Sequence, residues 1–345
     1  MKKYLLTNTG NFYKANLHCH TTTSDGRLTP EEVKREYLNR GYSIVAYTDH
    51  NTLISRQHLT DEGFLALNGI EIDVLEPDWV GIGHHIKVCH ICMIALDADN
   101  LIQPCYHRTK HIEHEEIHAQ IKFDKSKPDF ERKYSPECVN AVIKEGRDGG
   151  FFVTYNHPTW SLEDYRDYSL YKGMHAMEIC NYSSHVTGMT EYNSHVYDDL
   201  LRLGNRIYCI GADDNHNTAS LADKNSDSFG AFTMIKAPRL DYKSITDALL
   251  NGDFYASQGP LINALWVEDG ILHIECDDAE CIKFNTYGRH RCALYAPEAG
   301  SLTSAEFTLE DEDVYVRVTV IDKNGKCANT SAYFVDEILD KAGNV

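Results

Sequence analysis

Short apolar segments recur along residues 15–211, and most of them end in, or next to, a histidine or a carboxylate residue. Stretches with helical periodicity separate these segments, a pattern typical of strands connected by helices. In an α/β barrel the carboxyl ends of the strands converge on one face, where active sites form. The sequence therefore predicts an α/β fold that gathers these polar residues in one cavity. We expect strands within residues 15–18, 43–48, 64–71, 86–95, 151–155, 177–180 and 206–211.

Two of the intervening helices have clear start signals. Thr29 and Ser135 are each followed by a proline and then by glutamate. A hydroxyl residue at the N-cap, proline in the first turn and acidic residues near the positive helix end all favour helix initiation. Glycines at 41 and 149 are expected to end these two helices.

The polar residues at the strand ends are of the types that bind metal ions. His18 and His20 form a His-x-His pair on an extended strand, which directs both imidazoles to the same side. A single histidine of this kind has a structural explanation more often than a functional one. Recurrence at successive strand ends instead indicates a shared metal site. The other members of the set are Asp25, Asp49, His50, Glu71, His90, His157, Asp214 and His216.

The order and spacing of these residues resemble the PHP (polymerase and histidinol phosphatase) family. The resemblance is carried by residues 16–26, 47–51, 69–71, 156–158 and 211–216, and it covers residues 12 to 260. It implies a distorted (β/α)7 barrel, two or three Mn, Zn or Fe ions, and hydrolysis of phosphoric esters. Aspartate at position 25 resembles the stand-alone phosphoesterase branch more than classical histidinol phosphatases, many of which have histidine there.

Carried over residue by residue, the resemblance implies three metal sites that share ligands. The first ion would be held by His18, His20, Glu71 and Asp214. Glu71 would bridge to a second ion, completed by His90 and His157. Asp25, His50 and His216 would hold the third ion.

Two of these assignments have competitors in the sequence. His84 and His85 compete with His90, which we prefer because residues 90–97 resemble the family's strand. Asp213 competes with Asp214, which we prefer because it forms the Asp-x-His pattern with His216.

The ligand set suggests a mechanism. A hydroxide that bridges the first two ions would attack phosphorus, because metal binding lowers the pKa of water. The third ion would offset charge on the leaving oxygen. Asp49 would orient His50 or a neighbouring ligand. The residues expected to take part in catalysis are Glu71, Asp214, His216 and Asp49, and the general acid stays open between His216, Asp214 and a metal-bound water.

The charge balance limits the substrate. The chain has 345 residues, with 33 basic and 52 acidic side chains and a formal net charge of -19. Affinity for nucleic-acid backbones comes from basic side chains that displace counterions, so this balance disfavours long DNA or RNA. Metal ions can reverse the sign of the charge inside a site. We expect a small phosphorylated metabolite or nucleotide, as a phosphomonoester or small phosphodiester.

Beyond residue 260 the helical periodicity disappears and apolar residues alternate with polar ones. We expect a barrel domain over residues 1–258 and a small antiparallel β domain over 259–345, which could serve as a contact in a homo-oligomer. No apolar run reaches the roughly 20 residues of a membrane helix, and the first residues do not resemble a signal peptide. Eleven cysteines without a disulfide framework complete the expectation of a cytoplasmic protein.

Two alternative functions remain open from the sequence. Residues 114–118 read H-E-x-x-H, the helical motif of zinc metallopeptidases. His107, His111, His114 and His118 would share one face of that helix, and Glu137 is the available third ligand. The second alternative is a non-catalytic barrel that only binds a metal or ligand. Residues 98–135 depart from the family pattern and are a candidate lid or specificity element.

Overall fold

The computed structural model describes residues 2–77, 86–112, 114–298 and 300–339. Its centre is a mixed sheet in which seven strands follow one another in chain order. They are β2 (Asn11–Asn16), β3 (Ile44–Tyr47), β4 (Leu65–Leu75), β5 (Val88–Ala95), β6 (Phe151–Tyr155), β7 (Ala176–Asn181) and β8 (Tyr208–Ala212). The α/β class is confirmed, and each predicted strand overlaps an observed one, but β2 ends at Asn16, before His18.

Strand directions divide this sheet into two parallel groups. The strands β2, β3 and β4 run parallel, as do β6, β7 and β8. Between the two groups, β5 is antiparallel to both of its neighbours. In the part of the chain that the structure describes, no ladder joins β8 to β2, and the segments that follow these two strands are linked by an isolated bridge from Cys19 to Asn215 and by a hydrogen bond from Arg27 N to the His216 carbonyl. The structure thus has a large mixed sheet and does not show a closed barrel.

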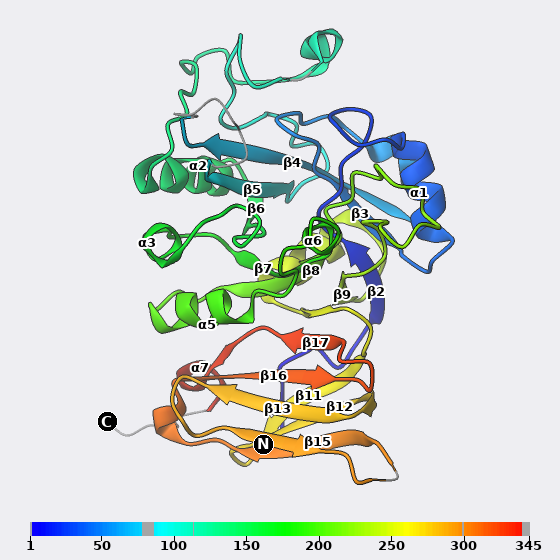
Figure 1. Cartoon of the computed structure of the whole chain (residues 1–345), viewed down its shortest axis with the longest axis vertical. Helices are drawn as coiled ribbons and strands as arrows, with labels where there is room; N and C mark the ends of the chain where they lie inside the picture. The colour runs from blue at the N-terminus through cyan, green and yellow to red at the C-terminus, as the bar shows by residue number, and fades with distance from the viewer. Residues whose placement is uncertain (1, 78–85, 113, 299, 340–345) are drawn as a thin grey trace.

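Helices cover the outside of this sheet, and α2, α3 and α5 lie along one side of the strands in Figure 1. The capping residues explain the helix boundaries. Thr29 and Glu32 form a capping box at α1, Ser135 caps α2, and α6 ends at Gly252, whose φ of 75° favours glycine. The helices are α1 (Pro30–Leu38), α2 (Pro136–Asp148), α3 (Tyr165–Tyr168), α4 (Ser183–Val186), α5 (Ser194–Arg202), α6 (Tyr242–Asn251) and α7 (Val335–Ile338), with 3₁₀ turns η1 (Gln57–Leu59), η2 (Glu115–Gln120) and η3 (Asp311–Asp313).

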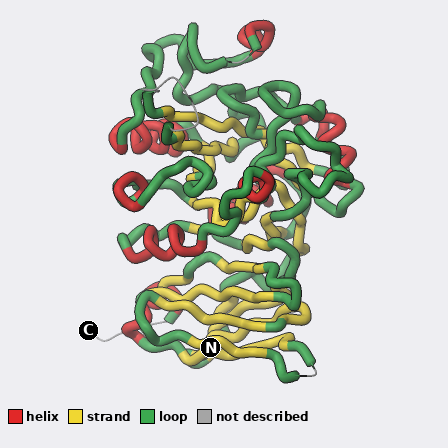
Figure 2. The backbone as a smooth tube through the Cα atoms, viewed as in Figure 1, coloured by secondary structure: helices red, strands yellow, loops and turns green. Residues whose placement is uncertain are grey.

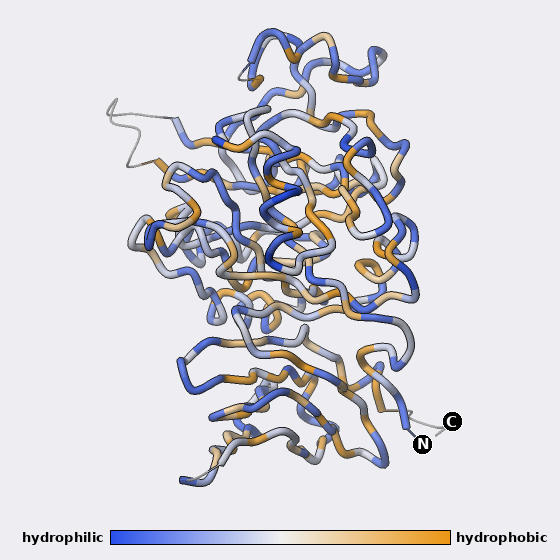
Figure 3. Tube along the Cα trace, turned by 90° about the vertical axis from the view of Figure 1, so that its right-hand side faces the viewer, coloured by the Kyte–Doolittle hydropathy of each residue, from blue (hydrophilic) through white to orange (hydrophobic). Residues whose placement is uncertain are grey.

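The β-rich tail forms the lower end of the molecule in Figures 1 and 2, near both marked chain ends. Its strands pair antiparallel, and Figure 3 shows hydrophilic and hydrophobic residues alternating along them. The strands are β11 (Ile262–Glu268), β12 (Ile271–Ala279), β13 (Cys281–Thr286), β14 (Cys292–Tyr295), β15 (Leu302–Thr308), β16 (Tyr315–Ile321), β17 (Cys327–Thr330) and β18 (Tyr333–Phe334).

Two ladders connect the tail with the rest of the chain, β1 (Lys3–Tyr4) with β11 and β10 (Phe254–Ser257) with β17. The short β1 in this way joins the tail's second sheet. The strand β10 also pairs with β9 (Phe232–Ala237), and β9 pairs with β2. The tail therefore continues the central sheet by way of β10 and β9. The predicted boundary between residues 258 and 259 stays a prediction.

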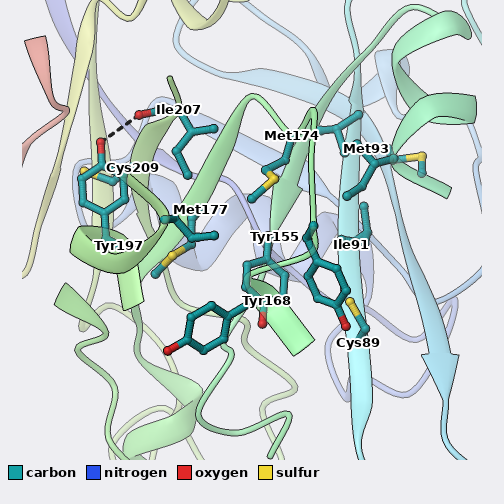
Figure 4. Close-up of a cluster of buried hydrophobic side chains, with 14 of the residues drawn as sticks. Cys89, Ile91, Met93, Tyr155, Tyr168, Met174, Met177, Tyr197, Ile207 and Cys209 are labelled. Atoms are coloured by element: carbon teal, nitrogen blue, oxygen red, sulfur yellow. Dashed lines mark hydrogen bonds between the residues drawn. The ribbon is translucent and has the colours of Figure 1, made fainter. Parts of the chain in front are cut away.

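Apolar side chains fill the space between the sheet and the helices. Figure 4 shows part of this core, in which the Tyr197 hydroxyl donates a 2.9 Å hydrogen bond to the Ile207 carbonyl. All eleven cysteines are free. Among the described residues, no helix has both the length and the apolar character needed to cross a bilayer.

Candidate metal centre

The predicted ligands meet in one place: Glu71 lies within β4, His90 lies within β5, and the others lie in the segments that follow β2, β3, β6 and β8. Their donor atoms form three groups, and within each group the atoms lie within 4.8 Å of one another. The first group is His18, His20, Glu71 and Asp214; the second is Glu71, His90 and His157; the third is His20, Asp25, His50 and His216. All nine residues that the sequence singled out as ligands therefore come together.

The first group is buried at the base of the site. Asp214 Oδ1 lies 3.1 Å from Nε2 of both His18 and His20. Glu71 Oε1 is 3.1 Å from His18 Nε2, and Glu71 Oε2 is 3.2 Å from His20 Nε2. All four residues are buried. An ion between these atoms would be shielded from bulk solvent.

The other two groups extend from the first towards the surface. Glu71 Oε1 lies 3.0 Å from His90 Nδ1 and 3.4 Å from His157 Nε2. The Asp25 carboxylate is 3.3 Å from His216 Nε2 and 3.5 Å from His20 Nδ1. The side chain of Asp25 is 41% exposed, so the third group lies at the mouth of the cavity.

Unsatisfied atoms test whether this donor set suits a cation. Buried polar atoms almost always have a hydrogen-bond partner. Three buried atoms in the first group have none: His20 Nδ1, Glu71 Oε2 and Asp214 Oδ1. Nitrogen and carboxylate donors that converge in this way, with atoms left unpaired, fit divalent metal ions.

The electrostatics agree with this interpretation. Burial raises the pKa of Glu71, but His18 and His90 outweigh this effect and hold the pKa well below its ordinary value. Burial lowers the pKa of His50 to about 3, and the neighbouring His20 adds to the effect. Glu71 thus stays anionic and His50 stays neutral, which are the forms that bind metals.

The structure shows different places for the two competing aspartates. Asp213 accepts backbone hydrogen bonds from residues 229–231 and one from the Tyr37 hydroxyl, so its carboxylate is fully occupied outside the groups. Asp214 is the aspartate inside them. His90 lies in the second group, whereas His84 and His85 lie outside the described residues.

Asp49 contacts the turn next to a predicted ligand and not His50 itself. Its carboxylate accepts hydrogen bonds from the Thr21 backbone (2.7 Å) and the Ser24 hydroxyl (3.0 Å), and Arg56 lies 3.1 Å away. None of its described hydrogen bonds goes to a histidine. Asp49 instead holds the turn that carries Asp25, so its contact with the ligand set is indirect.

Glu178 is a part of the site that the sequence reasoning missed. Its Oε1 accepts a 2.7 Å hydrogen bond from His18 Nδ1, and its Oε2 accepts bonds from the His157 backbone (3.1 Å) and the Asn181 amide (2.9 Å). The available signal was a glutamate inside the apolar segment 177–180, since a charged residue in a buried strand needs a partner.

The H-E-x-x-H segment does not assemble a comparable group. Residues 115–120 form the 3₁₀ turn η2 rather than an α-helix, so His114 and His118 do not share a face. His114 Nε2 donates a 2.8 Å hydrogen bond to the Ser24 carbonyl. Within the described ranges, no group of converging ligand atoms includes His114, His118 or Glu137.

An open cavity of about 390 Å³ lies over the candidate centre. This volume is in the range of small-ligand sites. Its wall includes seven of the predicted ligands, Asp25, His50, Glu71, His90, His157, Asp214 and His216, together with Arg27, Trp160, Ser183, Thr187 and Thr218.

No protein-family model matches the chain. A 5'-3' exoribonuclease from Haemophilus influenzae is 35% identical over 78 residues, which are 21% of this chain and 27% of that protein, so the match spans about a quarter of the relative's length. Among solved structures, a two-domain protein containing a predicted PHP-like metal-dependent phosphoesterase from Bacteroides vulgatus is 15% identical, with a TM-score of 0.46 and coverage of 95% of this chain and 97% of that chain. A metal-dependent phosphoesterase of unconfirmed activity from Bifidobacterium adolescentis is also 15% identical, with a TM-score of 0.40 and coverage of 65% and 94%.

Proposed function

We propose that this chain is a metal-dependent hydrolase of the PHP family that cleaves phosphoric esters of small metabolites or nucleotides. One observation carries the proposal: the two oxygens of Glu71 face different sets of histidines in one buried cavity. Its Oε1 lies near His18, His90 and His157, and its Oε2 lies 3.2 Å from His20 and 3.3 Å from His50. A carboxylate in this position suits two neighbouring ions. The local similarity to an exoribonuclease supports a phosphoester as the bond that is cleaved.

Two or three divalent ions, Mn, Zn or Fe, would be held by the three groups. When bound, they would polarise the phosphoryl group and lower the pKa of a water molecule towards neutrality. The chain's own residues fix the geometry. Glu178 orients His18 through Nδ1 and leaves Nε2 directed at the first group, since a donated Nδ1–H defines the tautomer. Asp49 holds the turn of Asp25 in place.

Neither side chain proposed as general acid is free to donate a proton once ions are held. Burial raises the pKa of Asp214, but His18 and His20 outweigh this effect and hold it well below its ordinary value, so Asp214 carries no proton to donate at neutral pH. His216 Nε2 lies 3.3 Å from Asp25 in the third group, and His216 Nδ1 lies 3.0 Å from the Asp214 carbonyl. An ion held at Nε2 would leave only the Nδ1–H, which is directed at that carbonyl, so we propose that the leaving oxygen takes its proton from water held by an ion.

The remaining expectations stay proposals that accompany this function. The sheet β2–β8 would be an incompletely closed form of the (β/α)7 barrel, with domains at 1–258 and 259–345. The acidic chain would act in the cytoplasm on small substrates rather than on long nucleic acids. The β-rich tail would provide the contact between subunits of a homo-oligomer.

The test is metal loading combined with an ester screen. Chelator-treated protein is reloaded with Mn²⁺, Zn²⁺ or Fe²⁺ and assayed against phosphomonoesters and small phosphodiesters, with bound metal measured in parallel. We expect turnover and bound metal to disappear together in His18→Ala. The control is His58→Ala, because His58 is an exposed histidine that contacts only Glu31 among the ionised groups described.

Three results separate the proposals. If the protein retains no metal after incubation with any of the three ions, the proposed function loses its basis. Stable metal binding without hydrolysis of any ester would favour the non-catalytic alternative. Cleavage of peptides instead of phosphoesters would favour the peptidase.

A further inference from the structure

The cavity over the candidate centre continues into a second hollow of about 440 Å³. The two hollows share four lining residues: Asp25, His50, His90 and Trp160. A phosphoryl group at the shared residues would therefore have space on both sides. The substrate can extend from the metal centre in two directions.

Trp160 stands where the two hollows meet. Its ring centroid lies 5.0 Å from that of His157 and 5.5 Å from that of His90, and the residue is 37% exposed. The turn that carries it is anchored on both sides. Ser161 N donates to the His157 carbonyl and Val88 N donates to the Ser161 carbonyl, each at 3.1 Å. The indole is thus held beside two predicted ligands while part of its surface stays open.

Beyond the shared residues, the second hollow is lined by three apolar side chains, Leu75, Val88 and Ile112, and by Asn51, Asp73 and His111. Leu75 is 45% exposed, and Val88 and Ile112 are partly exposed. Exposed apolar side chains beside a polar site are typical of ligand contacts. The first hollow differs, because its outer wall carries Arg27 and three hydroxyl residues.

The charges of the described lining disfavour a further phosphate group in the second hollow, and burial lowers the pKa of His111 there to about 4, so this histidine supplies no positive charge at neutral pH. Among the described residues that line it, none is a lysine or an arginine. Its one carboxylate outside the ligand set, Asp73, is paired with Arg132 at 3.2 Å. A second anionic group in this hollow would meet Asp25 without a compensating cation. An uncharged group would bury apolar surface there at no such cost.

We propose that Trp160 is a stacking platform for a planar, uncharged group, a nucleobase or aryl ring, that is linked to the phosphoryl group in the metal centre. This inference rests on the proposed function and narrows its substrate class to nucleoside monophosphates and similar aromatic phosphoesters. Stacking on an aromatic side chain tolerates different bases, because every base has a π-face. Trp160 is thus a specificity-determining residue.

A matched pair of substrates tests the platform. Adenosine 5'-monophosphate and ribose 5-phosphate carry the same phosphorylated sugar and differ by the base. We expect Trp160→Ala to raise KM for the nucleotide about tenfold and to leave KM for ribose 5-phosphate within twofold. Trp160→Phe should recover most of the loss, because a phenyl ring still stacks. Trp266→Ala is the control, since Trp266 lies in β11 of the tail and stacks on His273.

The contrary result is equally specific. If the ring only shields His90 and His157, Trp160→Ala would change KM for both substrates by the same factor and would lower the metal content. The proposal that Trp160 stacks on the base would be wrong if KM changed by equal factors for the two substrates, or if it changed for neither.

Calorimetric binding of the same two compounds separates this inference from the proposed function. Preferential binding of the nucleotide that is lost in Trp160→Ala, without any turnover, would keep the platform and remove the hydrolase. Turnover of both compounds with no preference for the base would keep the hydrolase and remove the platform. Binding of neither compound would overturn both.

Discussion

Nδ1 of His18 lies 2.7 Å from Oε1 of Glu178, and both side chains are inaccessible to solvent. Glu178 also accepts the backbone N–H of His157, so one carboxylate fixes residues from two of the three donor groups. Carboxylates that orient metal-binding histidines in this way raise their basicity and set their tautomer.

We therefore expect Glu178→Gln to weaken metal binding by about 10–100-fold, with turnover lowered in parallel. Metal titration followed by a competing chelator measures the effect. Glu163→Gln is the matched control, because Glu163 is also buried but binds the hydroxyls of Tyr134, Tyr155 and Tyr171 instead of a histidine. An affinity in Glu178→Gln equal to that of the control would argue against the orienting role.

Glu71 and Asp25 should give different metal stoichiometries. Glu71 lies in two donor groups, whereas Asp25 lies only in the third group at the mouth. We expect Glu71→Ala to abolish turnover and to reduce bound metal strongly, because one carboxylate serves two ions. Asp25→Asn should spare the ions of the first two groups and mainly lower the rate. Elemental analysis of the loaded variants checks both. Full activity in Glu71→Ala would remove its bridging role, and unchanged kinetics in Asp25→Asn would count against a third catalytic ion.

The features found correctly from sequence are those with a local signal. A His-x-His pair at the end of an apolar run, or a Thr-Pro-Glu-Glu helix start at residue 29, depends only on neighbouring residues. Since parallel strands bring their carboxyl ends together, these local features were enough to predict that Glu71 and His157 approach each other.

The features that were missed depend on contacts between distant segments. The reversal of β5 depends on its pairing with β4 and β6, and no residue within β5 signals it. The two residues of β1 pair with β11, more than 250 positions away. Asp49 was expected to orient His50 or a neighbouring ligand, and which of these it supports depends on the fold, which brings Thr21 and Ser24 of the Asp25 turn to its carboxylate. The role of Glu178 depends on the fold, because its partner His18 follows β2 while Glu178 lies in β7.

Metal loading should release protons. In the metal-free chain burial lowers the pKa of His20, but Asp214 and Glu71 outweigh this effect and raise the pKa to about 10. His20 is therefore protonated at pH 7 and must lose a proton to bind an ion. We expect affinity to rise from pH 7 towards pH 10, and calorimetry in buffers of different ionisation enthalpy to detect the released proton.

The His20 imidazole gives the stability of the metal-free fold the opposite pH dependence, since stability falls where metal affinity rises. Because its folded pKa lies above the ordinary value of 6.5, its contribution is complete below pH 6.5 and is lost as the pH rises through about 10. Metal affinity that is independent of pH across this range would contradict the protonated state of His20.

Arg132 should anchor the segment 98–135 to the rest of the fold. Its side chain is 3% exposed and donates to the Asn51 side chain (2.6 Å) and to the Asp73 carbonyl (3.0 Å), beside the 3.2 Å pair with the Asp73 carboxylate. Removal of one partner leaves a buried charge, so Arg132→Ala should cost about 3–5 kcal/mol of unfolding free energy. Denaturant titration measures it, and proteolysis within the segment should accelerate.

The exposed pair in the same segment is the control for that measurement. Arg108 lies 2.6 Å from Asp129, and its side chain is 38% exposed. Arg108→Ala should cost no more than about 1 kcal/mol, because solvent screens such pairs. Similar losses in the two variants would show that burial of Arg132 does not determine its contribution.

Glu115 distinguishes the phosphoesterase from the peptidase. In a zinc peptidase the glutamate of H-E-x-x-H activates the water, so Glu115→Gln would abolish hydrolysis while the histidines keep the metal. Here Glu115 is exposed at the start of η2, and His114 is already bound to the Ser24 carbonyl. We expect Glu115→Gln to keep both the metal content and the phosphoesterase rate of the unmodified chain.

His114→Ala should keep the bound metal as well, but it should raise KM moderately, because the lost hydrogen bond frees the turn next to Asp25. Both variants are compared with His18→Ala by elemental analysis and steady-state kinetics. If bound metal is lost from His114→Ala and retained in His18→Ala, the metal site lies in the H-E-x-x-H segment, because an ion held by the first group requires His18 and has no contact with His114.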